Sequence, residues 1–571
     1  MQKVTKDKIY LTLTGLVFAC SLLFSCAGKH LGKNNSGEYK NGMVVSASEI
    51  ASQVGVDILK KGGNAVDAAV AVQFALAVVY PNAGNLGGGG FMVYRSAKGE
   101  TSTLDFREKA ASAASRDMYL DAAGNPIVEK SLYGQLAAGV PGSVAGMEEA
   151  HQKYGKLKWE DLVNPSIALA TNGFKLTTRQ ANELNGLKNR FSKLNPLGTA
   201  LVKDTKWVAE DVLVQTELAN TLKAIAKEGR KGFYEGAVAD SIVAEMKRGG
   251  GIIAKQDLID YKAIWRKPVT GTYRGYDVVT MPPPSSGGIA LIQLLKSVEP
   301  FPLSRWGFNS DSTVQVMIEA ERRVYADRAA HLGDPDFYKV PQQKLIDDAY
   351  IKQRMSTFNW KMASTSTSVS AGQIAPSEHE ETTHFSIVDK EGNAVAITTT
   401  LNGSYGAGVV VKGAGFLLNN EMDDFSVKPG SPNMYGLVGG EANAIAPGKR
   451  MLSSMTPAIL AKDGNLYMVV GTPGGSTIIT SVFQTILNVV DFNMSMQNAV
   501  NAKKFHHQWL PDEVLVEENA MDSLTTEKLK AKGYKFVRRG AIGRVDAILK
   551  TKWGYYQGGA DPRGDDKAIG W

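Results

Sequence analysis

Residues 377–402 read SEHEETTHFSIVDKEGNAVAITTTLN, and this pattern predicts two strands joined by a turn. Apolar and polar side chains alternate on both sides of the polar run 389–393, and a period of two is typical of strands. If residues 389–393 form the turn, antiparallel pairing places Thr382 opposite Thr400 at the open end of the hairpin. The two hydroxyl groups would then lie side by side. Such a pair is also common as a plain cross-strand contact, so the pattern alone leaves its role open.

The same stretch resembles a zinc-binding motif at first sight, because His379, Glu380 and His384 nearly form H-E-x-x-H. That motif requires two histidines four residues apart on one helix face, whereas these two are five apart, which turns the second by about 140°. The residues that follow also have the period of a strand. We therefore expect no metal and no cofactor.

The composition indicates a globular protein with either one large or two medium cores. The chain has 571 residues, of which 43% are hydrophobic and 21% are charged. The net charge is +7, but no run of five or six basic residues occurs. We therefore expect no nucleic-acid partner.

The N-terminus has the features of an export signal. In residues 1–26 a basic start precedes a short apolar run, and the chain's two cysteines, Cys20 and Cys26, both lie in this segment. The residues before Cys26 resemble a bacterial lipobox; a lipobox at Cys20 or a plain secretory signal remain alternatives. Residues 27–42 are polar and resemble a tether. We expect an exported, periplasmic protein that contacts the membrane only through a lipid anchor.

The rest of the chain mixes helical and strand patterns. Residues 55–79 have helical spacing interrupted by Gly62, which predicts two helices joined by a turn, and 84–95 predict a glycine-rich loop that enters a strand. Residues 130–265 are mostly helical in pattern. Residues 362–380 are rich in Ser and Thr and weakly periodic, so we expect a mobile segment directly before the hairpin. Further helices are expected after the turn at 281–286 and up to about residue 333.

A threonine hydroxyl is a poor nucleophile unless a base lies beside it, and a residue's own α-amine can be that base. An α-amine titrates near pH 7.7–8, so part of it is unprotonated at neutral pH. Thr382 could use this chemistry only after cleavage behind Glu381. A flexible segment before Thr382 would allow such cleavage.

Ten motifs, in order along the chain, together resemble the γ-glutamyltranspeptidases, a family of N-terminal-nucleophile (Ntn) hydrolases. The resemblance covers essentially everything from Met43 to Trp571. It implies an α+β fold, the four-layer αββα sandwich, formed jointly by a large subunit, 43–381, and a small subunit, 382–571, of a self-cleaved precursor. The motifs are GGNAVDAAVAV (62–72), GNLGGGGFMVYR (84–95), DFREKA (105–110), GVPGSVAGM (139–147), PPPSSGGIAL (282–291), THFSIVDKEGNAVAITTTLN (383–402), GFLLNNEMDDFS (415–426), KRMLSSMTPAIL (449–460), GTPGGSTIIT (471–480) and ADPRGDD (560–566).

The resemblance also implies the catalytic residues. Thr382 is the expected nucleophile, freed by cleavage between Glu381 and Thr382, and Thr400 is expected to hydrogen-bond it. Gly474 and Gly475 match an oxyanion hole made of two backbone N–H groups. Without the family, these two glycines would be interpreted only as a turn.

The remaining matched positions describe a pocket for a γ-glutamyl group. Tyr435, in the loop 431–450, matches a residue that covers the substrate. The positions expected to bind the α-carboxylate are Arg107, Ser453 and Ser454, and those expected to bind the α-amine are Asn402, Glu421 and Asp424. As an isolated residue, Arg107 could equally form a surface salt bridge with Asp105 or Glu108. The acidic motif at 419–424 lacks the ligand alternation of a calcium loop.

The implied activity is transfer of the γ-glutamyl group of glutathione and related compounds to water, amino acids or dipeptides. The large and small subunits would form a heterodimer. One alternative is an amide acylase of the cephalosporin (glutaryl) type on the same scaffold, and another is an exported binding lipoprotein without catalysis. We expect His384, His506 and His507 to serve packing rather than catalysis.

Overall fold

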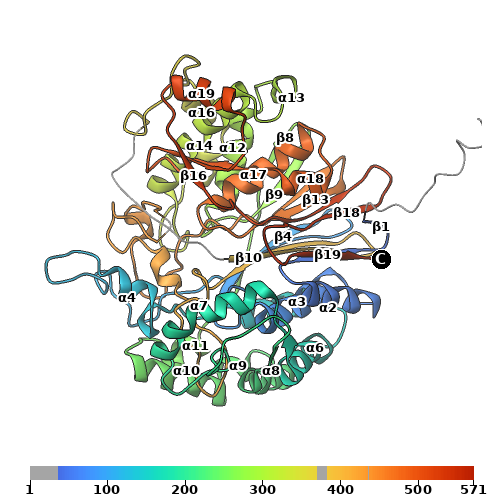
Figure 1. The fold of residues 1–571 in the computed structure, drawn as a ribbon, viewed down its shortest axis with the longest axis vertical. Helices are drawn as coiled ribbons and strands as arrows, with labels where there is room; N and C mark the ends of the chain where they lie inside the picture. The colour runs from blue at the N-terminus through green and yellow to red at the C-terminus, as the bar shows by residue number, and fades with distance from the viewer. Residues whose placement is uncertain (1–36, 370–381, 435) are drawn as a thin grey trace, which may run out of the picture. The chain divides into compact units, whose positions relative to one another are not determined.

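Two seven-stranded sheets form the centre of the protein. A computed structural model describes residues 37–369, 382–434 and 436–571 (Figure 1). The first sheet has the order β1 (Glu38–Tyr39), β18 (Tyr556–Gly559), β17 (Asp546–Lys550), β13 (Asn465–Gly471), β12 (Ala458–Lys462), β9 (Tyr276–Thr280), β8 (Val269–Tyr273). The second has the order β19 (Lys567–Gly570), β2 (Met43–Ser46), β10 (Thr382–Val388), β11 (Ala394–Thr400), β3 (Gly89–Arg95), β4 (Thr101–Asp105), β7 (Ile264–Arg266).

The predicted hairpin is confirmed and lies in the middle of the second sheet. β10 pairs antiparallel with β11, from Val388 opposite Ala394 to Thr382 opposite Thr400. β2 flanks the hairpin on one side and β3 on the other, also antiparallel. Every residue of β10 and β11 is buried, because other layers cover both faces of this sheet.

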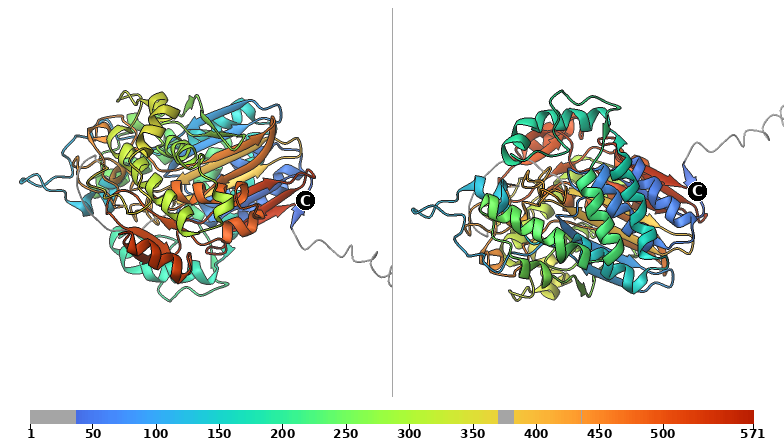
Figure 2. Two further views of the ribbon diagram at one scale, coloured as in Figure 1. Left: turned by 90° about the horizontal axis from the view of Figure 1, so that it is seen from above. Right: turned by 90° about the horizontal axis from the view of Figure 1, so that it is seen from below.

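Three groups of apolar side chains show how the layers stack. One group, which includes Val45, Ile459 and Ile548, lies between the two sheets. A second joins the other face of the second sheet to helices α2, α3, α5, α6 and α8, and a third joins the other face of the first sheet to α12, α14 and α17. Figure 2 shows helices on both outer sides of the sheets. The α+β, four-layer αββα arrangement is therefore confirmed.

The two helices expected within residues 55–79 are present, and they are joined at Gly62–Gly63. Asn64 begins the second helix with a capping box, since its side chain accepts from the N–H of Asp67, whose carboxylate accepts from the N–H of Asn64.

The helices on the second sheet's side are α2 (Glu49–Lys60), α3 (Ala65–Val79), α5 (Ser143–Tyr154), α6 (Trp159–Asn172), α7 (Thr178–Leu194), α8 (Thr216–Glu228), α9 (Lys231–Tyr234), α10 (Gly236–Gly249) and α11 (Lys255–Ile259). Those on the first sheet's side are α12 (Gly287–Val298), α13 (Leu303–Trp306), α14 (Asp311–His331), α16 (Asp348–Met355), α17 (Thr477–Val490), α18 (Met496–Asn501) and α19 (Ser523–Ala531).

The remaining elements are short: α4 (Val128–Leu132), α15 (Gln342–Leu345), three 3₁₀ turns, the strand pair β5 (Phe174–Lys175) and β6 (Val212–Leu213), and the small sheet β14 (Phe505–His506), β15 (Val514–Glu517), β16 (Phe536–Arg539). Among the described residues, no helix combines the length and the apolar character that crossing a bilayer requires.

Several predictions fall outside the described residues: the signal peptide 1–26 with Cys26, most of the tether, Glu381, Tyr435, and most of the Ser/Thr-rich segment. Within the described residues, the first element is β1, which lies inside the stretch 27–42 that resembles a tether.

Candidate active site

The two threonines at the open end of the hairpin lie between the two sheets. Thr382 is the first residue of β10 and Thr400 the last of β11, and their hydroxyl oxygens are 3.5 Å apart. Both side chains are buried, at 3% and 2% exposure. Alternation places Thr382 on the same strand face as Ser386, whose hydroxyl donates to the carbonyl of Asp546 in the first sheet. The pair therefore faces the space between the sheets.

The direction of the Thr400 hydroxyl follows from its neighbour Asn402. The backbone N–H of Asn402 donates to Oγ1 of Thr400 over 2.7 Å, so this oxygen is already an acceptor and its own hydrogen is available to Thr382. Asn402 has a left-handed backbone with φ of +72°, a conformation that non-glycine residues adopt uncommonly. Its side-chain amide donates to the carbonyl of Asn420 over 2.9 Å. This geometry leaves the hydroxyl hydrogen of Thr400 available for donation to Thr382.

Two glycines approach Thr382 from the loop between β13 and α17. Gly474 and Gly475 have φ of +136° and +48°, which only glycine adopts readily at the first position. Their carbonyls accept from the N–H groups of Thr477 and Ile478 in the first turn of α17. Within the described residues, neither glycine N–H donates to a backbone carbonyl. The first turn of α17 therefore lies beside the threonine pair through Ile478, together with Gly475, whose N–H donates to no backbone carbonyl of the described residues.

A buried group of charged side chains forms the other end of the site. Arg107, which follows β4, donates through Nη1 to Glu421 and through Nη2 to Asp424, and Oε2 of Glu108 lies 3.6 Å from Nη1. Burial disfavours the charge on Arg107, but these carboxylates outweigh it and raise its pKa above the ordinary value. Arg107 is thus a buried cation, and the alternative of a surface salt bridge does not apply.

Burial raises the pKa of each of the three carboxyl groups, and the charge of Arg107 opposes the rise. The pKa of Glu421 lies well above its ordinary value, and that of Glu108 is raised to about 7. Among the residues that the structure describes, Oε2 of Glu421 has no hydrogen-bond partner, and neither has either carboxyl oxygen of Glu108. Burial therefore favours the protonated form of Glu421, and Asp424 is the second carboxyl group in contact with Arg107.

Arg107 and its carboxylates fill most of the space beside the threonines. The cavity there has a free volume of about 20 Å³, close to what one water molecule occupies. A ligand can enter only if these ion pairs separate. The cavity is lined by Arg107, Thr382, Thr400, Asn402, Glu421, Asp424, Leu437, Ser453, Ser454, Met455, Gly475 and Ile478.

The fold thus brings nearly all predicted site residues together, although they come from segments more than 300 residues apart. Gly474 adjoins the cavity through Gly475, whereas Glu381, Tyr435 and Cys26 lie outside the described residues. The sequence did not single out Glu108 for the site, nor the apolar lining residue Leu437. The position of Glu108 beside Arg107 in the chain was the one available signal.

The three histidines lie apart from this cavity. His384 hydrogen-bonds Thr398 and Ser386, and His506 hydrogen-bonds Thr480 and Gln508. Burial lowers the pKa of both to about 3, and it lowers the pKa of His507 to about 4. All three are neutral, buried side chains that do not line the cavity.

Comparisons with known proteins give one consistent result. The family model for gamma-glutamyltranspeptidase matches residues 51–571. The chain is 49% identical, over 535 residues that cover 93% of it and 92% of the relative, to a glutathione hydrolase proenzyme of Escherichia coli K12. A crystal structure of cephalosporin acylase from Bacillus halodurans superposes with a TM-score of 0.83 at 27% identity, covering 95% of this chain and 98% of the other. A Helicobacter pylori gamma-glutamyltranspeptidase chain superposes with a TM-score of 0.57 at 44% identity, covering 61% of this chain and 99% of its own length.

Proposed function

Because this chain belongs to the γ-glutamyltranspeptidase family, we propose that it transfers the γ-glutamyl group of glutathione and related compounds to water or to the amine of an amino acid or dipeptide. The observation that carries the proposal is the cavity that joins Thr382 and Thr400 to Arg107, Glu421 and Asp424. The proposed nucleophile thus lies in the same cavity as a guanidinium that could bind an α-carboxylate and carboxyl groups that could bind an α-ammonium.

Maturation would cut the peptide bond between Glu381 and Thr382. Thr382 is the first residue of β10, so the new α-amine would lie beside the hydroxyl pair. The Helicobacter pylori chain supports two separate polypeptides, since nearly all of it matches only 61% of this chain. The expected products are the large subunit 43–381 and the small subunit 382–571, paired as a heterodimer.

In the proposed reaction, Oγ1 of Thr382 attacks the γ-carbonyl carbon of the substrate while the α-amine of Thr382 accepts the hydroxyl proton. Thr400 donates a hydrogen bond to Thr382, and the N–H groups of Gly474 and Gly475 stabilise the oxyanion. The C–N bond then breaks, and the leaving amine takes the proton from the α-ammonium. Water or an acceptor amine attacks the acyl-threonine ester in turn and restores the free hydroxyl.

The charged residues of the cavity suit the zwitterionic end of a γ-glutamyl group. Its α-carboxylate would replace Glu421 and Asp424 on Arg107, with help from Ser453 and Ser454, and its α-ammonium would bind the two freed side chains together with Asn402. Inserting both charges at once leaves no buried ion without a partner. This exchange explains how a filled cavity can open at an acceptable cost.

The loop 431–450 would close over the substrate, with Tyr435 covering it. Two contacts support this role. The side-chain amide of Asn433 donates to Oδ1 of Asp424 over 3.0 Å, and the N–H of Met434 donates to Asp423 over 2.9 Å. The loop is therefore tied to Asp424, which the substrate amine would bind, and to the neighbouring Asp423.

An acylase of the cephalosporin type is the nearest competing function. A glutaryl group lacks the α-amine, so Glu421 and Asp424 would lose their reason for lying in the pocket. The solved cephalosporin acylase is also the more distant relative, at 27% identity against 49% for the glutathione hydrolase proenzyme. An exported binding lipoprotein without catalysis would not need the paired hydroxyls of Thr382 and Thr400.

For localisation, we propose export through the signal 1–26, lipidation at Cys26 and a periplasmic enzyme held to the membrane by the tether. Lipid at Cys26 would be the chain's only membrane contact. Mass spectrometry of the N-terminal peptide tests it, and an unmodified mature N-terminus beyond Cys26 would refute lipidation.

The central test is a denaturing gel of the purified protein. Cleavage before Thr382 should give two bands of roughly 38 and 20 kDa, estimated from fragment length, whereas Thr382→Ala should give one uncut band. The wild type should also release aniline from γ-glutamyl anilide faster than from glutaryl anilide. A wild type that never cuts would support the binding-protein alternative, and a preference for glutaryl would support the acylase.

A further inference from the structure

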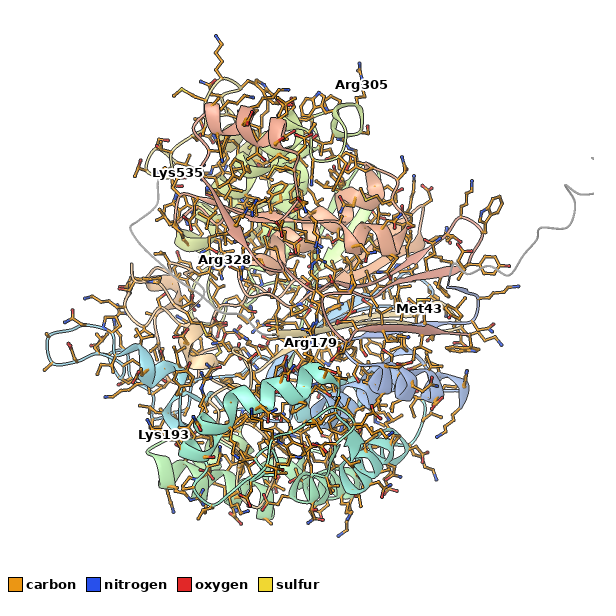
Figure 3. All side chains as sticks on the ribbon, viewed as in Figure 1. Met43, Arg179, Lys193, Arg305, Arg328 and Lys535 are labelled. Carbon is orange, nitrogen blue, oxygen red and sulfur yellow. The ribbon has the colours of Figure 1, made fainter. Side chains whose placement is uncertain are left out.

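A second buried arginine lies behind the cavity. Arg328, in the last turns of α14, is 4% exposed and lies in the interior, unlike the outward-facing Arg305 (Figure 3). Its Nε donates to Oγ of Ser286 over 2.9 Å, and its Nη2 donates to Oγ of Ser454 over 3.1 Å. Within the described part of the chain it forms no ion pair within 4.0 Å. A buried guanidinium bonded only to hydroxyls is uncommon, because charge is normally paired in the interior.

These contacts fix the direction of the Ser454 hydroxyl. A guanidinium can only donate, so Oγ of Ser454 is the acceptor and its hydrogen must point elsewhere. Ser454 lines the cavity. Oγ of Ser453 likewise accepts, from the N–H of Met455 over 3.1 Å. Each serine oxygen thus already accepts one hydrogen bond, and its own hydrogen is available to donate to an anion.

Arg328 also fixes the position of this serine pair. Ser286, at the start of α12, receives the Nε bond from Arg328 and donates from both its hydroxyl and its N–H to the carbonyl of Ser453, over 2.6 and 2.7 Å. The N–H of Ser453 donates to the carbonyl of Pro284 over 3.0 Å. α14, the start of α12 and the two serines thus form one hydrogen-bonded unit.

The charges around the cavity point to the same ligand group. Arg107 is already bound by Glu421 and Asp424, and Glu108 lies close to it. Arg328 contributes a second positive charge, which Asp424 attracts without forming an ion pair within 4.0 Å. An entering carboxylate would be attracted by this charge before Arg107 is released from its partners.

We propose that Arg328 is a positioning residue for recognition of the substrate's α-carboxylate: it occupies an acceptor position of the Ser454 hydroxyl, which leaves the hydroxyl hydrogen available to the carboxylate, and it places a second positive charge behind that hydroxyl. The inference rests on the proposed γ-glutamyl function and extends it to a residue outside the cavity lining. Arg328 touches neither Thr382 nor the oxyanion-binding glycines, so it should affect binding of the α-carboxylate and leave maturation and the chemical step largely unchanged.

The test compares Arg328→Gln, Arg328→Lys and wild type on two anilides. γ-Glutamyl anilide carries the α-carboxylate, whereas 4-aminobutyryl anilide keeps the amine and lacks only that carboxylate. Arg328→Gln should raise KM for γ-glutamyl anilide about 10- to 100-fold with kcat within about threefold. Its kcat/KM for 4-aminobutyryl anilide should stay within about threefold, and Arg328→Lys should recover part of the loss.

Two further variants separate positioning from structure. Ser454→Ala should produce the same substrate-dependent loss, and the double variant with Arg328→Gln should lose little more than either single one, because both act on one hydrogen bond. Arg354→Gln is the control. Arg354, in α16, pairs with Asp327, which lies on the same helix as Arg328. Arg354 does not line the cavity. Arg354→Gln should change kcat/KM for the two anilides by the same factor.

Equal loss on both anilides by Arg328→Gln would overturn the proposal, as would additive losses in the double variant. If Arg328→Gln stays uncut or unfolded, the Ser454→Ala and Arg328→Lys results decide: an unchanged substrate ratio in both refutes the inference. A wild type that releases no aniline from γ-glutamyl anilide refutes the proposed function itself, which is a distinguishable result.

Discussion

Hydrogen-bond direction determines what individual hydroxyls in this site can do. Thr400 accepts from the N–H of Asn402, and Ser454 accepts from Arg328, so each has its hydrogen left for the cavity. One donor points toward the Thr382 hydroxyl and the other toward the place proposed for a carboxylate. An N–H group and a guanidinium can only donate, so each uses an acceptor position of its hydroxyl partner and leaves the hydroxyl hydrogen available.

At Thr400 this predicts a specific loss. Thr400→Ala should slow both the proposed cut before Thr382 and anilide release about 10- to 100-fold, because Thr382, the proposed nucleophile, loses a hydrogen-bond partner, and Thr400→Ser should restore most of both rates. The time course on a denaturing gel and steady-state kinetics measure the two steps. Thr399→Ala, on the opposite face of β11, is the matched control and should leave both rates near wild type. Normal maturation of Thr400→Ala would contradict this role.

Glu421 should make stability depend on pH. Burial raises its pKa well above the ordinary 4.5, so the folded protein keeps a proton that the unfolded chain releases above that pH. Its contribution to stability is therefore complete below about pH 4.5 and falls as the pH rises toward the folded pKa. Glu421→Gln keeps the shape and removes the titration. Its melting temperature should exceed that of wild type by a margin that grows from pH 5 to pH 8.

The control for this prediction is Glu391→Gln at an exposed turn position, which should show a constant difference. Because burial favours the uncharged form of Glu421, Glu421→Gln should also keep kcat/KM within about fivefold. Asp424→Asn should lose far more activity, because an amide presents an N–H group to one of the two donors that now bind its oxygens. A constant melting difference across the pH range would contradict a raised pKa for Glu421.

At the scale of the element, the two ends of the hairpin β10–β11 have different roles: one end carries the proposed reactive threonines, and the other attaches the hairpin to the rest of the fold. Its open end carries Thr382 and Thr400, and its turn is fastened by Asp389, which is 1% exposed. Oδ1 of Asp389 accepts from the N–H groups of Gly392 and Asn393, and Oδ2 accepts from the N–H of Ala65 at the start of α3. One carboxylate thus closes the turn and joins it to a buried helix.

Asp389→Ala should therefore cost about 2–3 kcal/mol of unfolding free energy, because buried N–H donors lose their acceptor. Chemical denaturation measures the loss. The kcat of the folded fraction should change little, since the turn lies at the far end of β10 from Thr382. Lys390→Ala, an exposed neighbour in the same turn, should have little effect on stability. Unchanged stability in Asp389→Ala would mean that water replaces the carboxylate without cost.

At the scale of the whole molecule, the proposed cut falls inside an interleaved fold. In the second sheet, β10 and β11 lie between β2 and β3, and β19 pairs with β2 on its other side. In the first sheet, β12 pairs with β9 from the N-terminal part. Each sheet therefore contains strands from both sides of residue 382, and strands from the two sides pair directly with each other.

Cleavage before Thr382 should accordingly leave the two polypeptides associated. They should elute together at about 59 kDa in native size-exclusion chromatography, at the volume of uncut Thr382→Ala, and separate only in denaturant, because dissociation would break sheet pairs and expose both cores. Separation of the fragments in native buffer would show that the sheets do not hold them together.

The sequence by itself determined the local features. Alternation around residues 389–393 specified the register that pairs Thr382 with Thr400, and helical spacing around Gly62 specified two helices. These predictions succeed because strand and helix periods, turn residues and caps are properties of neighbouring residues. The ordered motifs added the family, and with it the residues to place in one site.

Only the tertiary structure decided which charges meet. In the folded protein Glu108 lies beside Arg107, and Glu421 and Asp424 form ion pairs with the same arginine. Arg328 of α14 donates a hydrogen bond to Ser454. No local period encodes these contacts, because they arise when the two sheets bury their inner faces and bring distant segments to one edge. Burial then sets which carboxyl groups keep a proton, and that depends on the solvent excluded by the whole fold.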